Sequence, residues 1–74
     1  MILKVGDKVL WTNQHGITVE IVVVGIQELY YNEHTEELIG RNVQEIDWKN
    51  KFVVDLENDK WAYNYQIKPI YLNE

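Results

Sequence analysis

Hydrophobic and polar positions alternate with a period close to two along much of this chain, which is typical of β-strands. Residues 5–11 follow this pattern and predict a strand that starts around Asp7. Residues 12–16 are a polar cluster closed by a glycine, which is typical of a turn. Residues 17–26 are dominated by β-branched side chains and predict a second strand.

The second predicted strand changes character along its length. Residues 17–21 alternate between apolar and polar, whereas residues 22–26 are apolar on both faces. The second half is therefore expected to be covered on both sides or paired with another copy of the chain. Gly25 interrupts the run and predicts a bulge or a sharp bend, as the corner of a barrel requires. The residues expected at a homo-oligomer interface are Val22, Val24 and Ile26.

The long segment 27–50 leaves two alternatives open. Asn32 can cap a short helix over residues 33–39, with glutamates in its first turns. The same residues can form the tip of a hairpin in which residues 28–31 pair with residues 38–46. Alternation after residue 42 favours the extended alternative.

The last third of the chain predicts a compact all-β ending. Residues 52–56 read as a strand, residues 57–60 as a tight polar turn, and residues 61–63 as the returning strand. Residues 67–71 form a final short strand, which Pro69 places at an edge because proline lacks an amide donor. The sum is about five short strands, and so small a sheet protects its edges best by closing on itself.

Composition places the whole chain, residues 1–74, in a single small domain. It is 46% hydrophobic, which excludes a disordered acidic tail, and it has no cysteine. The longest apolar run is far shorter than the ~20 residues of a membrane helix, and no signal peptide is recognisable. We therefore expect a cytoplasmic protein that does not enter a membrane.

The net charge of −5 is concentrated in one segment. Residues 1–27 and 48–74 are each neutral, so the whole imbalance lies in residues 28–47. Such a segment repels phosphate backbones and attracts cationic partners, which argues against nucleic-acid binding and favours a basic protein or peptide. Its charges are Glu28, Glu33, Glu36, Glu37, Glu45 and Asp47 against Arg41.

Few residues of this chain suit catalysis. Serine and cysteine are absent, the four glycines are isolated, and His15 lies in a predicted surface turn. His34 is flanked by glutamates, but only a helix would bring it onto one face with Glu37. We expect no enzyme activity, no cofactor and no dedicated metal site.

The nine aromatic residues are the better clue. Three to five of them are expected in the core, with Phe52 and Trp61 buried and Trp11 partly buried. Neighbours in a strand point to opposite faces, so the tyrosines cannot all be buried. Exposed rings beside carboxylates suit a cation. The predicted contact surface is Tyr30, Tyr31, Glu33, Glu36, Glu37, Tyr63 and Tyr65.

The order of these segments resembles the SH3-like small barrels, including KOW-type and Tudor-type modules. Val5-Gly6-Asp7-Lys8-Val9 resembles their opening strand, and residues 15–19 resemble the Gly-x-Val strand that follows the first turn. Residues 52–70 resemble their closing unit of strand, tight turn, strand, one helical turn and short strand. The resemblance implies a five-stranded barrel with residues 27–50 as a long acidic insertion, and it implies no particular activity.

Four functional hypotheses follow. The first is a protein–protein interaction module that receives a basic partner on the acidic, tyrosine-rich surface. The second is a self-assembling structural or inhibitory protein of phage or mobile-element type, and the third is nucleic-acid binding of KOW type. The fourth rests on a similarity of residues 65–68 to the pore segment of the type II dihydrofolate reductases, in which Gln66 and Ile67 match and Lys68 replaces a tyrosine.

Overall fold

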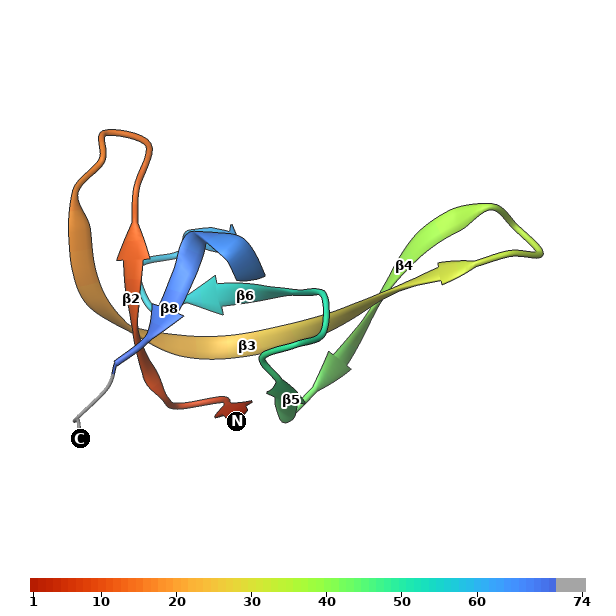
Figure 1. Ribbon diagram of the computed structural model, residues 1–74, viewed down its shortest axis with the longest axis horizontal. Helices are drawn as coiled ribbons and strands as arrows, with labels where there is room; N and C mark the ends of the chain where they lie inside the picture. Colours follow the sequence, from red (N-terminus) through yellow and green to blue (C-terminus); the bar gives the residue numbers. More distant parts are fainter. Residues whose placement is uncertain (71–74) are drawn as a thin grey trace.

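The computed structural model describes residues 1–70, and this part of the chain is all-β (Figure 1). A single 3-10 turn, η1 (Asn64–Gln66), interrupts the strands. No helix in residues 1–70 has the length and apolar character needed to cross a membrane. The strands are β1 (Ile2–Lys4), β2 (Lys8–Thr12), β3 (Thr18–Asn32), β4 (Glu37–Val43), β5 (Glu45–Asp47), β6 (Phe52–Leu56), β7 (Trp61–Tyr63) and β8 (Ile67–Pro69).

Six of the strands share one antiparallel sheet. Its hydrogen-bonded path runs β7-β6-β3-β2-β8, and β4 pairs with β3 off this path. β8 pairs only with β2 among the described strands, which confirms the expected edge position of Pro69. The predicted strand extended to Tyr71, which lies outside the described residues. β1 and β5, which the sequence did not predict as a pair, form a separate two-stranded ladder.

The 15-residue strand β3 organises the molecule. Its first part pairs with β2, its middle with β6, and its last part with β4. The hairpin alternative for residues 27–50 is therefore correct, and residues 33–36 form its turn rather than a helix. The Asn32 side-chain oxygen accepts the N–H of His34 (2.9 Å), and this bond closes the turn. The returning strand is shorter than predicted, because it ends at Val43.

A β-bulge lies where Gly25 predicted it. The register between β3 and β6 shifts between Val23 and Gly25, which inserts Val24 as an extra residue. Alternation is thereby offset, so Val23 and Ile26 both face the core while Val24 is 52% exposed. The expected interface of Val22, Val24 and Ile26 is wrong in one member, because Ile26 is only 2% exposed.

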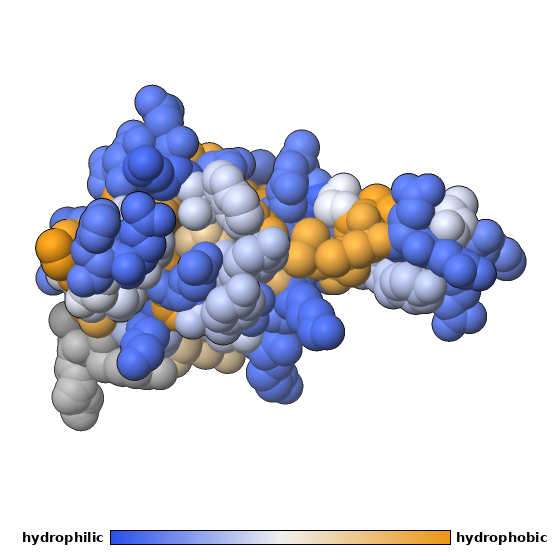
Figure 2. Space-filling model, turned by 90° about the horizontal axis from the view of Figure 1, so that it is seen from above, coloured by the Kyte–Doolittle hydropathy of each residue, from blue (hydrophilic) through white to orange (hydrophobic). Residues whose placement is uncertain are grey.

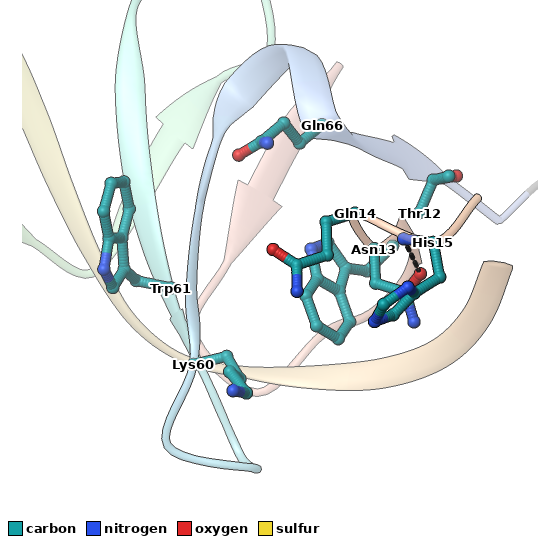
Figure 3. A pocket seen from close by; sticks show the side chains of 8 residues that line it. Thr12, Asn13, Gln14, His15, Lys60, Trp61 and Gln66 are labelled. Carbon is teal, nitrogen blue, oxygen red and sulfur yellow. Dashed lines mark hydrogen bonds between the residues drawn. The ribbon is translucent and has the colours of Figure 1, made fainter. Parts of the chain in front are cut away.

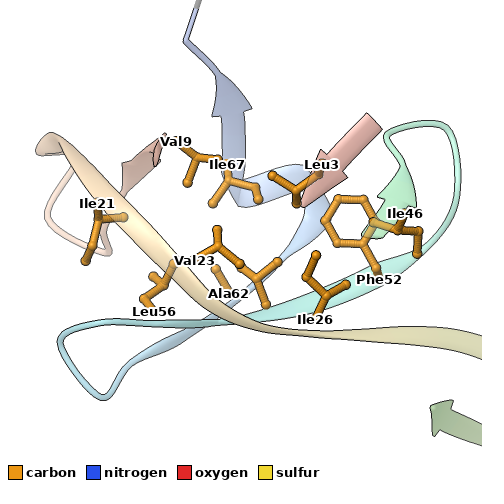
Figure 4. Close-up of a cluster of buried hydrophobic side chains, with 11 residues drawn as sticks. Leu3, Val9, Ile21, Val23, Ile26, Ile46, Phe52, Leu56, Ala62 and Ile67 are labelled. Carbon is orange, nitrogen blue, oxygen red and sulfur yellow. The ribbon is translucent and has the colours of Figure 1, made fainter. Parts of the chain in front are cut away.

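The core consists mainly of aliphatic side chains (Figure 4). Phe52 is fully buried as predicted, and the indole of Trp48 packs edge-on against it at a centroid distance of 5.8 Å. Trp11 is partly buried as predicted. The prediction for Trp61 is wrong: it is 56% exposed, because its register opposite Asp55 points it outward and leaves Ala62 as the inward residue of β7. The buried residues are Leu3, Val9, Ile21, Val23, Ile26, Ile46, Phe52, Val54, Leu56, Ala62 and Ile67.

The aromatic contribution to the core is at the low end of the expected three to five residues. Within residues 1–70, Phe52 is the one aromatic residue of the buried cluster, and Trp11 and Trp48 are partly buried and pack against this cluster. β-Branched and leucine side chains supply enough volume for so small a core. Most of the aromatic rings are thereby left available at the surface.

Candidate functional site

The last third of β3 and most of β4 form a ribbon that projects from the rest of the molecule (Figure 1). We call residues 28–42 the arm. β6 pairs with β3 only as far as Glu28, so beyond that position the two strands of the arm have no other strand beside them in residues 1–70. The projection makes the molecule elongated, with extents of 42 × 28 × 17 Å.

The register of the arm places its two tyrosines on opposite faces. Tyr31 pairs with Leu38, and Tyr30 pairs with Ile39. Successive side chains of a strand point to opposite sides of the sheet, so the pair of Tyr31 belongs to one face and the pair of Tyr30 to the other. Both tyrosine side chains and Leu38 are exposed.

The face that carries Tyr30 also holds an ion pair. Glu28 lies opposite Arg41, and the guanidinium donates to the carboxylate at 2.6 Å. This is a cross-strand pair of opposite charges, which favours the observed register of the ladder. It leaves the other glutamates of the arm without a described cationic partner.

The far end of the arm is acidic. Glu33 and Glu36 lie in the turn, Glu37 begins β4, and all three are exposed. The arm carries four glutamates against Arg41, a net charge of −3. Figure 2 shows hydrophilic side chains at the far end and hydrophobic surface nearer the body. The acidic segment predicted from the sequence is therefore divided, because Glu45 and Asp47 lie on β5 and outside the arm.

Three aromatic side chains form a continuous row on the surface of the body. Trp61 contacts Tyr63 edge-on with ring centroids 5.1 Å apart, and Tyr63 stacks on Tyr65 at 5.2 Å with nearly parallel planes. The Gln66 side-chain oxygen accepts the N–H of Tyr63 at 2.9 Å, which tightens η1 and holds the stacked pair in place. We call Trp61, Tyr63 and Tyr65 the aromatic row. Tyr65 is 74% exposed.

The sheet register relates the aromatic row to the arm. Tyr63 lies opposite Val53, and Val53 lies opposite Gln27 of β3. Tyr31 is four residues beyond Gln27 along the same strand, so it shares the face of the sheet that carries Tyr63. We call this the outer face.

The seven predicted contact residues therefore do not form one continuous surface. Tyr31, Tyr63 and Tyr65 belong to the outer face or its continuation in η1, and Tyr30 belongs to the opposite face of the arm. The three glutamates lie at the end of the arm, away from the aromatic row (Figure 1). The structure thus divides the predicted surface into two groups, one on the arm and one in the aromatic row.

A cavity of about 380 Å³ lies between three turns of the body (Figure 3). No pattern in the sequence predicted this cavity. The available signal was that each of two polar turns adjoins a tryptophan, with Trp11 shortly before one turn and Trp61 directly after the other. Its lining residues are Trp11, Thr12, Asn13, Gln14, His15, Lys60, Trp61 and Gln66.

The carboxylate of Asp47 is held in its charged form. The backbone N–H of Lys49 donates to it at 2.9 Å and, as the largest cause, lowers its pKa below the usual range of an aspartate. The positive charges of the chain's amino terminus and of Lys49 act in the same direction. This carboxylate closes the turn after β5 and is a structural group. Within residues 1–70, no three carboxylate or imidazole groups are placed to hold a metal ion.

Comparisons with known proteins found no matching family model, no matching curated protein and no matching solved structure. Similarity therefore assigns no role to the arm, the aromatic row or the cavity.

Proposed function

We propose that this chain is a small binding module of SH3-like architecture that receives a basic protein surface on its arm. The five-strand path β7-β6-β3-β2-β8 supports the SH3-like part of the proposal, because β8, the last of these strands in the sequence, pairs with β2, the first of them in the sequence. The order β6, tight turn, β7, η1, β8 supports it further, since it matches the closing unit that the resemblance implies.

The exposed arm is the observation that carries the proposed function. An isolated two-stranded ribbon is only marginally stable in water, and it gains stability from a further strand or a packed face. Tyr30, Tyr31 and Leu38 are exposed in its outer half. Tyrosine rings are enriched among the anchors of protein interfaces, because they bury a large area at a small cost in conformational entropy. A partner that covers these side chains would supply the contacts that the arm lacks.

Charge determines the kind of partner. The net charge of −3 on the arm is concentrated at its end, beside the exposed rings. Lysine and arginine gain from both groups, because the carboxylates attract them at long range and a ring face adds roughly 0.5 to 2 kcal/mol on contact. A basic protein or peptide therefore fits the arm better than an acidic one.

The outer face extends the contact surface toward the body. Tyr63 and Tyr65 share this face with Tyr31, and Val53 between them is only partly buried. A partner held at the end of the arm can rest on the aromatic row as a second contact. The proposed role is binding, because exposed rings and carboxylates are groups that contact a partner.

The test is a titration of the intact chain with a Lys/Arg-rich peptide, followed by amide NMR. Replacing Glu33, Glu36 and Glu37 together by glutamine should weaken binding about tenfold, because each screened charge contributes roughly 0.5 kcal/mol. The matched control removes the same number of exposed carboxylates from the body, at Glu20, Glu45 and Asp59. Binding by the control should change less than twofold.

Binding of the wild-type chain should also weaken as salt is raised, since exposed charges are screened over about 10 Å at 0.1 M. The proposal is wrong if the control variant loses as much affinity as the arm variant. It is equally wrong if the peptide shifts amides of the body alone and leaves those of residues 28–42 unchanged.

A further inference from the structure

The geometry points to the cavity between the β2–β3 turn, the β6–β7 turn and η1 as a second binding site, which takes a small planar anion of the nucleotide kind. No residue of the arm lines the cavity, and Trp61 is the one lining residue that also belongs to the aromatic row. Figure 3 shows Trp61 on one side, the Asn13–His15 turn on the other, and Lys60 and Gln66 between them.

Two indoles make the cavity suitable for a flat ring. Trp11 comes from β2 and is partly buried against the core, so its position is fixed by packing. Trp61 comes from β7 and is held by its edge-on contact with Tyr63. Trp11 and Trp61 both line this cavity although they lie on strands that are not neighbours in the sheet. Exposed aromatic faces of this kind bind planar rings by stacking.

Two amide side chains of the lining offer donors to a ligand. The side-chain oxygen of Asn13 already accepts the N–H groups of His15 (2.8 Å) and Ile17 (3.1 Å). The side-chain oxygen of Gln66 accepts the N–H of Tyr63. These backbone donors fix the orientation of both amides and leave their NH₂ groups free. These two amides therefore favour a ligand that supplies acceptors.

The charge of the lining also favours a ligand with acceptor groups, in particular an anion. Lys60 is the one formally charged side chain among the lining residues, and no carboxylate is among them. Asp59 precedes Lys60, and Asp55 lies opposite Trp61 in the ladder, but neither side chain lines the cavity. In a chain of net charge −5, this cavity is thus a place where an anion meets an ammonium group and amide donors.

Size restricts the ligand further. A volume of about 380 Å³ is within the usual range of small-molecule sites and suits one base with its sugar and phosphate. Inorganic phosphate would leave the indoles unused, and an uncharged ring would leave Lys60 unused. A nucleotide can contact both the indoles and Lys60, whether it is free or is one unit of a single strand.

The experiment titrates the intact chain with adenosine monophosphate, adenosine and inorganic phosphate, using amide NMR and tryptophan fluorescence. Adenosine monophosphate should shift the amides of residues 12–16 and 60–66. Adenosine and phosphate alone should each bind at least tenfold more weakly. A thymidine tetranucleotide distinguishes the source: tighter binding than the monophosphate indicates a strand, and equal or weaker binding indicates a free nucleotide.

Variants separate the two halves of the site. Lys60→Gln should lower the affinity for adenosine monophosphate at least fivefold and leave adenosine binding unchanged, whereas Trp61→Ala should weaken both. The matched controls are Lys51→Gln and Tyr65→Ala, which remove an exposed lysine and an exposed ring outside the cavity.

Two results would overturn the assignment. One is the absence of shifts with millimolar monophosphate and with the tetranucleotide. The other is binding that both controls weaken as much as the cavity variants do. A preserved amide spectrum of each variant establishes that its fold is intact, so loss of binding is not loss of structure.

Discussion

Glu57 and Val22, which are 35 residues apart in the chain, exchange two hydrogen bonds. The N–H of Val22 donates to the Glu57 carboxylate at 2.8 Å, and the N–H of Glu57 donates to the carbonyl of Val22 at 3.0 Å. Val22 lies immediately before the bulge in β3, and Glu57 begins the turn after β6. This carboxylate therefore supplies an acceptor at the place where the regular ladder is interrupted.

Replacing Glu57 by alanine should lower the free energy of unfolding by about 1 to 2 kcal/mol, because a charge-assisted hydrogen bond is lost while the backbone bond remains. Glu57→Gln keeps an acceptor and should cost less than half as much. Urea unfolding followed by circular dichroism measures both. Equal losses in the two variants would show that the side chain acts through its charge and not through this hydrogen bond.

Phe52 and Trp61 should differ sharply in their effect on stability. Trp61→Ala should lower the free energy of unfolding by less than about 1 kcal/mol, since more than half of the side chain is exposed. Phe52→Leu leaves a smaller side chain in a fully buried position and should cost about 1 to 3 kcal/mol. Urea midpoints provide the comparison, and a larger loss for Trp61→Ala would contradict the outward orientation of that indole.

Acid should destabilise the chain partly through Asp47. Its pKa is lowered in the folded state, so the charged carboxylate contributes stability above its unfolded pKa, and this contribution is lost as the pH falls through the folded pKa. Asp47→Asn can still accept the N–H of Lys49 but has no charge to titrate. The variant should therefore lose less stability than the wild type as the pH falls below about 4, the ordinary pKa of an aspartate. Parallel pH-dependent melts would contradict this prediction.

The ion pair between Glu28 and Arg41 should contribute little to overall stability but should stabilise the arm. A double-mutant cycle with alanine at both positions should give a coupling of about 0.3 to 1 kcal/mol, because the arginine side chain is largely exposed. The coupling should decrease at high salt. Amide exchange in residues 28–42 reports on the arm directly, and no increase in exchange for either single variant would contradict the role of the pair.

Local patterns predicted much of the strand structure. The turn at residues 12–16, the bulge near Gly25 and the final hairpin each follow from nearby residues with defined backbone preferences. The hairpin of the arm was one of two alternatives, and Asn32 decided between them by closing a turn with its side chain instead of capping a helix. Such choices depend on a few residues and are visible in the sequence.

The remaining features depend on contacts between distant segments. The three-residue strands β1 and β5 pair across more than 40 positions, and neither has a periodic pattern of its own. Trp61 faces outward because of its register against Asp55, which a pattern of residue types does not define. The cavity is formed by three turns that meet only in the folded chain, so its lining could not be identified one segment at a time.

The continuity of β3 from body to arm limits how the length of this protein can vary. If the pair Asn32 and Glu37 were removed, the turn would connect Tyr31 to Leu38. Hydrogen-bonded and non-hydrogen-bonded pairs alternate along an antiparallel ladder, so the turn would then follow a pair of the opposite kind. It would also present the turn's glutamates to the other side of the ribbon. Removing two successive residue pairs restores the kind of pair next to the turn and the side to which the glutamates point. Arms of altered length are therefore expected to differ by four residues at a time, and a homologue whose arm differs by two should need a different turn.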